Sequence, residues 1–458
     1  MSGEQIGGVA IDYLGLAQEL VEQVSRKGVE AEALIMAGQT TMVRVNKGQV
    51  EQLSQASPKG LGVRVIKEGR TGYAYTSDLS PQGVKESWRD ALALAESADP
   101  DEYRSLPEPQ PIEGGGLALY DPALVTVPTE EKIALAKEVE EAALSLDPRI
   151  VATIRCTYQD EAWHIYLANS RGLADSYERT VAATYLRAVA RDEESQVAGL
   201  GVGLSNFYGE LDPIAIGQEA VKRALELLGG NPLSTQRATV VLDPFAGTEL
   251  LFFISEALTG EAMQRGRSFL LGKLGQKVAS EAVNLVDNGR LPRGYASAPF
   301  DGEGVPTSLT RVMESGVLGH LLYDHYTAQK DGTRSTGNAS RGSYRHLPKV
   351  SPTNFYLEPS SLSREQLIRG VEVGFYIKST LNTGGINPIS GDYSVAANGL
   401  WIEKGEVTKP VSGVTVAGTL GEILKNITAV ADDLRFLPFY GSTGAPTVRI
   451  EGMQIGGK

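Results

Sequence analysis

The first pattern along the chain is an amphipathic helix followed by alternating strands. Between Asp12 and Lys27, apolar residues recur at helical spacing: Leu14, Leu16, Leu20, Val21 and Val24. Alternation of apolar and polar residues then predicts strands at 41–45, 60–66 and 72–76, with glycine-containing turns between them. Ser80-Pro81 predicts the start of a second helix, because serine caps free N–H groups and proline suits the first helical position. We therefore predict a helix, an antiparallel meander and a capped helix.

The same order of elements recurs downstream. The pattern predicts a helix at 129–146, strands around 152–158, 163–169, 181–189 and 196–204, and a helix opened by Asp212-Pro213. Pro81 and Pro213 hold equivalent places in the two series. This repetition predicts a duplicated α+β unit, and the stretch rich in proline and glycine between the copies is typical of a linker.

A different pattern begins after the second unit. A buried strand at 238–242 is followed by Asp243-Pro244, which predicts a capped helix continuing to Gln264. Beyond it, glycine-rich short strands with hairpins at 314–316 and 403–406 favour a barrel-like domain, crossed by a helix at 363–370. We expect a partly helical stretch at 416–434 and a final strand at 447–450.

The predicted fold class is α+β. A duplicated helix-meander-helix amino-terminal region precedes a mainly antiparallel, barrel-like carboxy-terminal β domain. The expected boundaries are 1–106 for the first unit, 107–128 for the linker, 129–232 for the second unit and 233–458 for the β-rich domain.

The amino-acid composition argues against some kinds of binding partner. The 458 residues carry a net charge of -13, which disfavours electrostatic binding to nucleic acid or to anionic membranes. The single cysteine, Cys156, permits no internal disulfide. Residues 1–5 lack the basic segment of a signal peptide, and no apolar run is long enough to span a bilayer. We expect a cytoplasmic protein.

Familiar catalytic patterns are missing from the sequence. The histidines are His164, His320, His325 and His346, and none is followed by glutamate or paired with another on one helix face. No metal site is predicted from them. The Gly-x-Ser-x-Gly elbow is also absent, and Cys156 lies in a strand pattern that favours a buried, inert thiol.

The carboxy-terminal half contains several recognisable segments. They are Phe300-Asp301-Gly302-Glu303-Gly304-Val305-Pro306-Thr307, Glu314-Ser315-Gly316-Val317-Leu318, Ser335-Thr336-Gly337-Asn338-Ala339-Ser340-Arg341, Pro352-Thr353-Asn354 and Gly405-Glu406-Val407-Thr408-Lys409-Pro410-Val411. These segments resemble the TldD/PmbA family of metallopeptidase-complex subunits. In the amino-terminal half, Gly69-Arg70-Thr71-Gly72 and the helix after Ser80 look similar to the same family. The matches occur in order over nearly the whole chain, which makes them stronger together than singly.

The resemblance implies that zinc ligands are missing here. The TldD branch carries His-Glu-x-x-x-His on the helix after the central strand and a cysteine near the carboxy terminus. One alignment sets 255–260 against that motif, so that Ser255 and Gly260 replace the outer positions and only Glu256 remains. A gapless alternative places Phe252-Phe253 there, and Tyr440 stands where the cysteine is expected. In lacking these ligands, the chain resembles the PmbA branch of the family, which is also called TldE.

The function implied by the resemblance is that of a non-catalytic PmbA/TldE-like subunit. It would form a heterodimer with a TldD-like catalytic chain and complete a chamber for unfolded or modified extended peptides. Zinc is expected in the TldD-like partner, with no cofactor, metal or catalytic residue in this chain. The resemblance leaves open a homodimer of the isolated chain, and neither nucleic acid nor membrane is expected as a partner.

The alternative is a stand-alone peptidase or hydrolase with a non-standard active site. Its candidate groups are Glu256, Asp392 and the cluster Tyr344, Arg345 and His346. Each also has a structural interpretation. Glu256 can be an exposed helix carboxylate, Asp392 a turn residue, and the cluster a set of peptide-contacting, sheet-surface or dimer-contact side chains.

Overall fold

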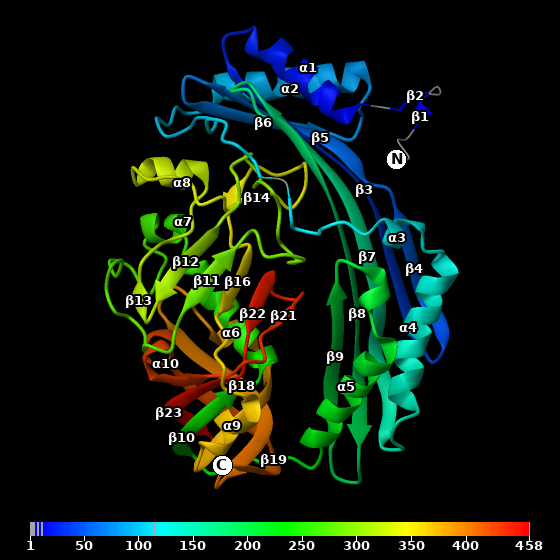
Figure 1. Ribbon diagram of the computed structural model, residues 1–458, viewed down its shortest axis with the longest axis vertical. Coiled ribbons are helices and arrows are strands. Elements are labelled where there is room, and N and C mark those ends of the chain that lie inside the picture. Colours follow the sequence, from blue (N-terminus) through cyan, green and yellow to red (C-terminus); the bar gives the residue numbers. More distant parts are fainter. Residues whose placement is uncertain (1–4, 7–8, 11, 114, 458) are drawn as a thin grey trace.

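A long seven-stranded sheet forms one side of the molecule in the computed structural model, which describes residues 5–6, 9–10, 12–113 and 115–457 (Figure 1). The strand order is β6-β5-β3-β7-β8-β9, and β4 pairs beside the carboxy-terminal half of β3. The strands are β3 (Glu30–Asn46), β4 (Gln49–Ala56), β5 (Lys59–Lys67), β6 (Arg70–Thr76), β7 (Ile150–Asn169), β8 (Ala174–Arg191) and β9 (Gln196–Ser205). The two amino-terminal units of the sequence thus contribute to a single sheet.

The junction of these units is the antiparallel ladder between β3 and β7. It runs from Glu32 opposite Asn169 to Val45 opposite Cys156. Sequence patterns predicted separate strands at 152–158 and 163–169, which was wrong because β7 is continuous. Asp160, one of the polar residues between those apolar runs, is buried in the ladder, where the ammonium of Lys132 lies 2.6 Å from its carboxylate. Because Asp160 is charged, it interrupts the apolar pattern, and a prediction from hydrophobicity alone therefore divides the strand there.

Helices cover the outer face of the sheet in two groups. α1 (Tyr13–Ser25) and α2 (Pro81–Ser97) pack with β3 and β5, while α4 (Thr129–Leu144) and α5 (Pro213–Leu227) pack with β7 and β8. Side chains of Asp12, Ser80 and Asp212 cap α1, α2 and α5. The short α3 (Pro122–Thr126) lies within the segment predicted as a linker, of which Gly114 is outside the described residues. Figure 1 shows α4 and α5 on one side of the sheet and the carboxy-terminal domain on the other.

A five-stranded barrel forms the carboxy-terminal domain's lower part, which confirms the predicted barrel-like architecture. Its strands are β10 (Gln236–Leu242), β17 (Val373–Leu381), β18 (Asp392–Glu403), β19 (Glu406–Thr419) and β23 (Val448–Gly456). The barrel closes because β10 pairs with β17 in parallel and with β23 in antiparallel orientation. The short β20 (Ile427–Val430) adds to β23.

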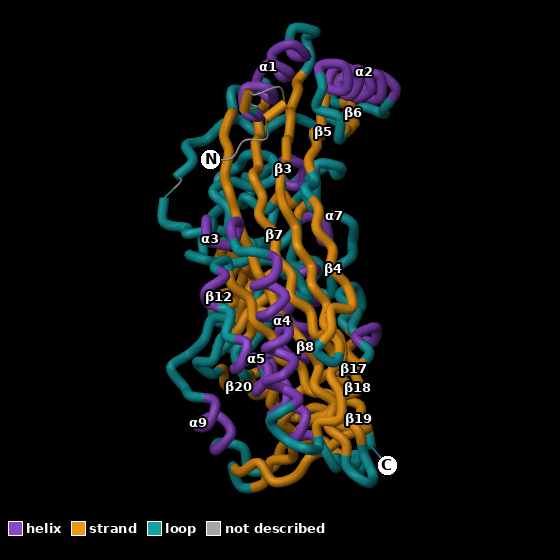
Figure 2. The backbone as a smooth tube through the Cα atoms, turned by 90° about the vertical axis from the view of Figure 1, so that its right-hand side faces the viewer, coloured by secondary structure: helices purple, strands orange, loops and turns teal. Residues whose placement is uncertain are grey.

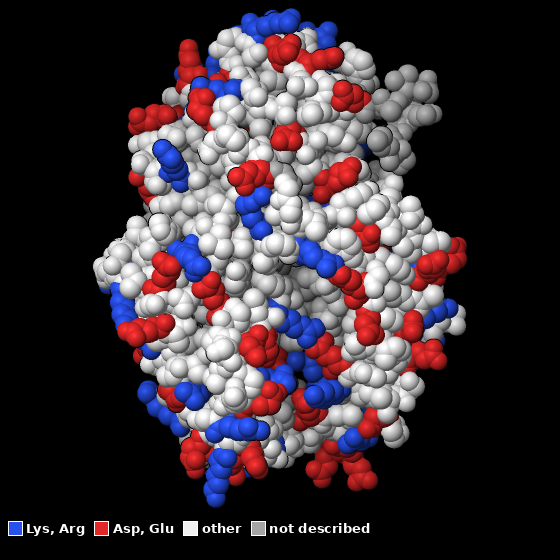
Figure 3. All heavy atoms as spheres, viewed as in Figure 1, with Lys and Arg blue, Asp and Glu red and all other residues white. Residues whose placement is uncertain are grey.

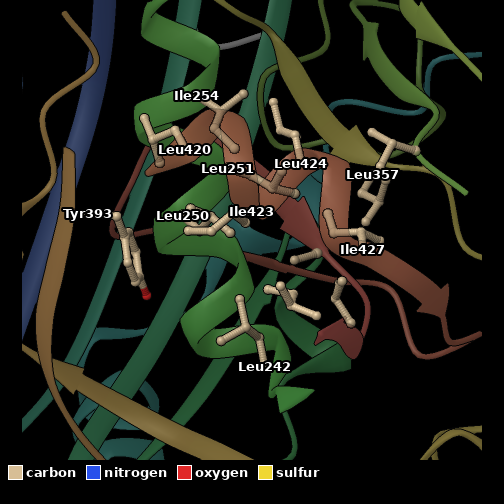
Figure 4. Packing of buried hydrophobic residues seen from close by; sticks show 14 of the residues in the cluster. Leu242, Leu250, Leu251, Ile254, Leu357, Tyr393, Leu420, Ile423, Leu424 and Ile427 are labelled. Atoms are coloured by element: carbon tan, nitrogen blue, oxygen red, sulfur yellow. The ribbon is translucent and has the colours of Figure 1, made fainter. Parts of the chain in front are cut away.

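The core of this domain is built around α6 (Pro244–Glu256). Leu250, Leu251 and Ile254 of α6 lie in one buried cluster with Ile423 and Leu424 of α10 (Leu420–Asn426) (Figure 4).

The helix predicted over 244–264 is interrupted, because α6 ends at Glu256 and α7 (Gly260–Gln264) is a separate helix. The break occurs because the Gly260 N–H donates to the carbonyl of Leu322 at 2.8 Å instead of continuing the helix.

A second sheet lies beside the barrel, with the order β13-β12-β11-β16-β22-β21. Its strands are β11 (Leu285–Asn288), β12 (Leu309–Glu314), β13 (Val317–Leu318), β16 (Asn354–Leu357), β21 (Arg435–Leu437) and β22 (Ser442–Ala445). The remaining elements are β1 (Gln5–Ile6), β2 (Val9–Ala10), η1 (Tyr208–Glu210), α8 (His325–Lys330), β14 (Ala339–Ser340), β15 (Lys349–Val350), α9 (Arg364–Arg369) and η2 (Thr383–Gly385). Of the helices within the described ranges, none combines the length and the apolar character needed to cross a bilayer.

Candidate functional site

Three of the segments that carry the family resemblance meet beside the long sheet. The Asp301 carboxylate accepts hydrogen bonds from the backbone N–H groups of Glu303, Val305 and Ala339, at 2.9, 3.0 and 2.9 Å. Asp287 of β11 accepts from the Asn338 side-chain amide at 2.7 Å and from the hydroxyl of Thr353 at 2.8 Å. These two buried carboxylates therefore hold loops 300–307, 335–341 and 352–354 against one another.

A cavity of about 160 Å³ lies between these loops and the inner face of the sheet. Leu34, Ile165 and Leu167 form its apolar wall, and Asp301 and Arg341 are among its polar lining residues. Burial, reinforced by the negative charge of the nearby Glu303, raises the pKa of Asp301. Burial also raises the pKa of Asp287 to about 6. Carboxyl groups with raised pKa values are found both in functional sites and in buried structural networks.

A buried ion network joins the same loops to the sheet. The Arg64 guanidinium of β5 donates to Glu32 of β3 at 2.7 Å and to Glu303 at 2.8 Å. Arg341 donates to Glu32 from the other side. All four side chains are at most 5% exposed. The network fixes the loops on the sheet, and sequence reasoning missed it because its partners are far apart along the chain.

The degenerate metal-site positions each have contacts of their own. The Ser255 hydroxyl is buried and donates to the Phe252 carbonyl at 2.7 Å, whereas Glu256 is exposed. Gly260 lies against Tyr323, whose ring would stand 2.3 Å from an added Cβ. The aromatic ring of Tyr440 packs on Phe252, with centroids 5.5 Å apart. The structure thus brings together Tyr440 and the helix residue chosen by the gapless alignment.

Glu249 is the polar residue of this region that sequence reasoning missed. It lies on α6, is 5% exposed and accepts a hydrogen bond from the Thr380 hydroxyl. Burial raises the pKa of Glu249, while the hydroxyls of Thr380 and Tyr440 act against that rise. Burial and the Glu249 carboxylate raise the pKa of Tyr440 in turn. The sequence did contain a signal for this residue, because Glu249 is a carboxylate within the mainly apolar stretch 244–256.

We tested whether these residues suit a zinc ion. Protein zinc sites use three or four Cys, His, Asp or Glu ligands. Here the Tyr440 phenol packs on Phe252, and the Glu249 carboxylate lies near that phenol. Within the described ranges, no three His, Cys, Asp or Glu side chains are grouped so that they could hold a metal ion. The donor set beside α6 does not fit zinc.

The other candidate residues lie elsewhere. Tyr344 is buried, and its carbonyl accepts a 2.7 Å hydrogen bond from the Tyr73 hydroxyl of β6. Arg345 lies over the Tyr344 ring at 5.5 Å, and His346 Nδ1 is 3.2 Å from the Ser343 hydroxyl. Asp392, at the start of β18, accepts from the Ser390 hydroxyl at 2.6 Å. The Tyr344 segment therefore contacts the sheet, whereas Asp392 stabilises its own turn.

The cysteine has the surroundings of an unreactive thiol. Cys156 is buried in β7, and its Sγ donates to the Ala136 carbonyl of α4 at 3.2 Å. Burial, together with the charge of Glu140, raises the pKa of the Cys156 thiol to about 12. Because the thiolate is the reactive form, Cys156 is a poor nucleophile in the folded protein.

Family models match three consecutive parts of the chain. They are described as PmbA/TldA metallopeptidase domain 1, central domain and C-terminal domain, and they match residues 31–98, 122–228 and 235–457. Among curated relatives, the Metalloprotease PmbA of Escherichia coli is 29% identical, over 94% of both chains. A Metalloprotease of Methanothermobacter thermautotrophicus is also 29% identical, over 97% of this chain and 99% of that one.

Solved structures show the same architecture. A putative modulator of a DNA gyrase from Thermotoga maritima superimposes with a TM-score of 0.88 at 28% identity, over 95% of this chain and 98% of that one. TldE from Thermococcus kodakarensis gives a TM-score of 0.88 at 24% identity, over 96% and 99% of the two chains, which supports the fold alone. The matched domains, their order and the full-length relatives together place this chain in the PmbA/TldD metallopeptidase family.

Proposed function

We propose that this chain is a non-catalytic, PmbA/TldE-like subunit of a TldD-type zinc metallopeptidase. In this proposal a TldD-like partner holds the zinc, and the two chains enclose a chamber in which extended peptides are processed, with the cytoplasm as the expected location. The observation that carries the proposal is the packing of Tyr440 on Phe252 beside the buried Glu249.

In this proposal the contact between Phe252 of α6 and Tyr440 has a structural role in place of a metal-binding one. An aromatic pair fills space and is stabilised by burial and ring contact. A phenol whose pKa is raised by burial and by a neighbouring carboxylate is a weak ligand at neutral pH, because the phenolate is disfavoured. Both features support the proposal that the residues around Tyr440 stabilise the fold without binding zinc.

The inner face of the sheet supports a peptide-handling role. Phe439, next to Tyr440, packs edge-on against Tyr185 of β8 with ring centroids 5.5 Å apart. A neighbouring cavity of about 230 Å³ is lined by Met42, Ser54, Tyr295 and Pro438, among other residues. In the view of Figure 3 the molecular surface is hollowed between the sheet and the carboxy-terminal domain. The cavity lined by Pro438, two residues before Tyr440, is where an extended peptide would pass toward a partner's metal.

The test compares the isolated chain with its complex. The full chain is purified alone and after co-expression with a TldD-like protein from the same genome, and zinc content and chelator-sensitive peptidase activity are measured for both. We expect zinc and activity only in the complex. Loss of activity on replacing a histidine of the partner's His-Glu-x-x-x-His motif, with activity retained in Tyr440→Phe of this chain, would support the assignment.

One result would overturn the proposal. If the isolated chain retained one zinc per molecule and hydrolysed peptides in a chelator-sensitive manner, this chain would itself be catalytic. Metal-independent hydrolysis by the isolated chain, abolished by Glu256→Gln or Asp392→Asn, would establish the alternative of a stand-alone enzyme with a non-standard site.

A further inference from the structure

β9 forms one margin of the long sheet, and a cleft lies beside its carboxy-terminal end. In the strand order it follows β8 and has no further strand beyond it. Residues 202–206 form one wall of a cavity of about 680 Å³. The carboxy-terminal domain supplies the opposite wall, with residues 291–295 and 434–436. Because an edge strand offers backbone groups for pairing, this cleft is a place where another strand can be added.

Two side chains occupy the free edge of β9 at Val202. The Val202 N–H donates to the Glu219 carboxylate at 3.3 Å, and the Val202 carbonyl accepts from the Arg435 guanidinium at 2.8 Å. The guanidinium also donates to the Glu219 carboxylate at 2.8 Å, so each of the three groups contacts the other two. In an antiparallel sheet, the opposite residue of the next strand supplies one acceptor and one donor in this way. The ion pair therefore takes the place of a residue in an added strand.

Close packing of α5 on β9 brings Glu219 to this edge. A Cβ at Gly201 would lie 2.1 Å from the Ile216 carbonyl oxygen of α5. A Cβ at Gly199 would lie 2.2 Å from the Ala220 carbonyl oxygen, one helical turn further on. Only glycine allows the helix to approach the strand so closely at these positions. Figure 2 shows α5 and α4 side by side over the lower part of the sheet.

Arg435 reaches the same edge from the other half of the molecule. It begins β21, and the chain then turns through the segment that carries Tyr440. Its guanidinium lies 4.8 Å from the centre of the Phe245 ring in α6. The side chains of Arg435 and Glu219 are 34% and 22% exposed. The pair thus joins the two walls of the cleft, and its partial exposure leaves it open to competition from solvent and salt.

The edge of β9 is held at this one position. Among the described residues, Val202 is the only residue of β9 whose backbone groups bind side chains. A second ion pair, between Arg293 and Glu210, also crosses the cleft, but its carboxylate accepts from the Ser205 hydroxyl and not from the backbone of β9. Loss of the first pair would therefore free the edge, whereas loss of the second would not.

We infer that the Glu219–Arg435 pair is an autoinhibitory contact, which closes the edge of β9 until an extended peptide replaces it. The main-chain carbonyl and N–H groups of the peptide would take over the hydrogen bonds that the two side chains make with Val202. Binding through main-chain groups places few demands on the peptide sequence. The identity of this occupant rests on the proposed peptide-handling function, whereas the closed contact is a property of the chain itself.

Hydrogen exchange measures the closed contact in the isolated chain. Glu219→Ala removes the acceptor of the Val202 N–H, so exchange at Val202, resolved within fragments covering 199–205, should become about tenfold faster. Glu210→Ala removes the matched carboxylate of the second ion pair and should leave this exchange unchanged. Circular dichroism establishes that both variants are folded. Unchanged exchange in Glu219→Ala would overturn the inference, because the pair would then not hold the edge in solution.

Peptide binding to the isolated chain tests the occupant. The probe is a fluorescein-labelled peptide of about eight residues, alternating valine and serine, and its twin is N-methylated at alternate amides, so that one of its edges lacks N–H donors. Fluorescence anisotropy gives the dissociation constants. Glu219→Ala and Arg435→Ala should each bind the unmethylated peptide about tenfold more tightly than the unmodified chain, because the edge is already free. Glu210→Ala should bind it as the unmodified chain does.

Two binding results would overturn the inference. Weaker or unchanged binding in Glu219→Ala and Arg435→Ala would mean that the pair does not compete with the peptide. An equal gain for the methylated twin would mean that the peptide does not pair with a strand edge. Both measurements use the chain without zinc or a partner, so a chain that proved to bind zinc would overturn the proposed function alone.

Discussion

The Arg64 guanidinium donates a 2.8 Å hydrogen bond to the carboxylate of Glu303, which lies 239 residues further along the chain. Arg64 belongs to the long sheet and Glu303 to a loop of the carboxy-terminal domain, so this buried pair ties together parts of the molecule that sequence patterns treat separately. The same guanidinium also neutralises Glu32.

Replacing Arg64 should therefore destabilise the protein strongly. Arg64→Gln leaves Glu32 and Glu303 buried with less compensating charge, and breaking a buried pair in this way costs about 3–5 kcal/mol. The free energy of unfolding from denaturant titration measures the effect. Lys67→Gln, which removes the half-exposed pair with Glu96, is the control and should cost less than about 1 kcal/mol. Similar losses in the two variants would show that the buried network contributes little.

Gly60 should tolerate no side chain, because the Tyr344 segment docks on it. A Cβ at Gly60 would lie 2.3 Å from the Tyr344 ring and 2.7 Å from the Thr76 carbonyl oxygen. Gly60→Ala is expected to lower the free energy of unfolding by about 1–3 kcal/mol through overpacking. Gly421 in α10 has open space around it, so Gly421→Ala should stabilise by up to about 1 kcal/mol. A neutral Gly60→Ala would mean that Tyr344 does not pack against the sheet in solution.

Glu249 should make stability depend on pH. Burial raises its pKa in the folded state, so its contribution to stability is fully present below the pKa of the unfolded chain and is lost as the pH rises through the folded pKa. Glu249→Gln removes the titration and can still accept from Thr380. The variant should therefore gain stability relative to the unmodified chain as the pH rises above the ordinary glutamate pKa of about 4.3, as followed by denaturant titration at several pH values.

A matched control separates this effect from loss of charge in general. Glu96→Gln removes a half-exposed carboxylate of α2. If Glu249→Gln differed from the unmodified chain by the same amount at every pH, the Glu249 carboxyl would not be held in the environment described here.

Much of the local structure followed from sequence, because its causes are local. Ser80, Asp212 and Asp243 predicted helix starts, and each side chain caps the expected helix. Short strands with turn signals predicted a barrel-like domain. The resemblance located the loops around Asp301, and the family matches agree with it.

Other features depended on contacts that alternation and helical spacing do not encode. Apolar alternation divided β7 into two strands, since the pattern contains no sign that Lys132 neutralises the buried Asp160. The break between α6 and α7 depends on the hydrogen bond from Gly260 to Leu322.

The sequence by itself determined the order of the elements, the family resemblance and the lack of a histidine pair, because these properties belong to the chain read residue by residue. Only the tertiary structure placed Tyr440 on Phe252 beside Glu249, joined both amino-terminal units in one sheet and brought an ion pair onto the edge of β9. Those outcomes depend on distant side chains that become neighbours when burial and neutralised charge offset the entropy lost on folding.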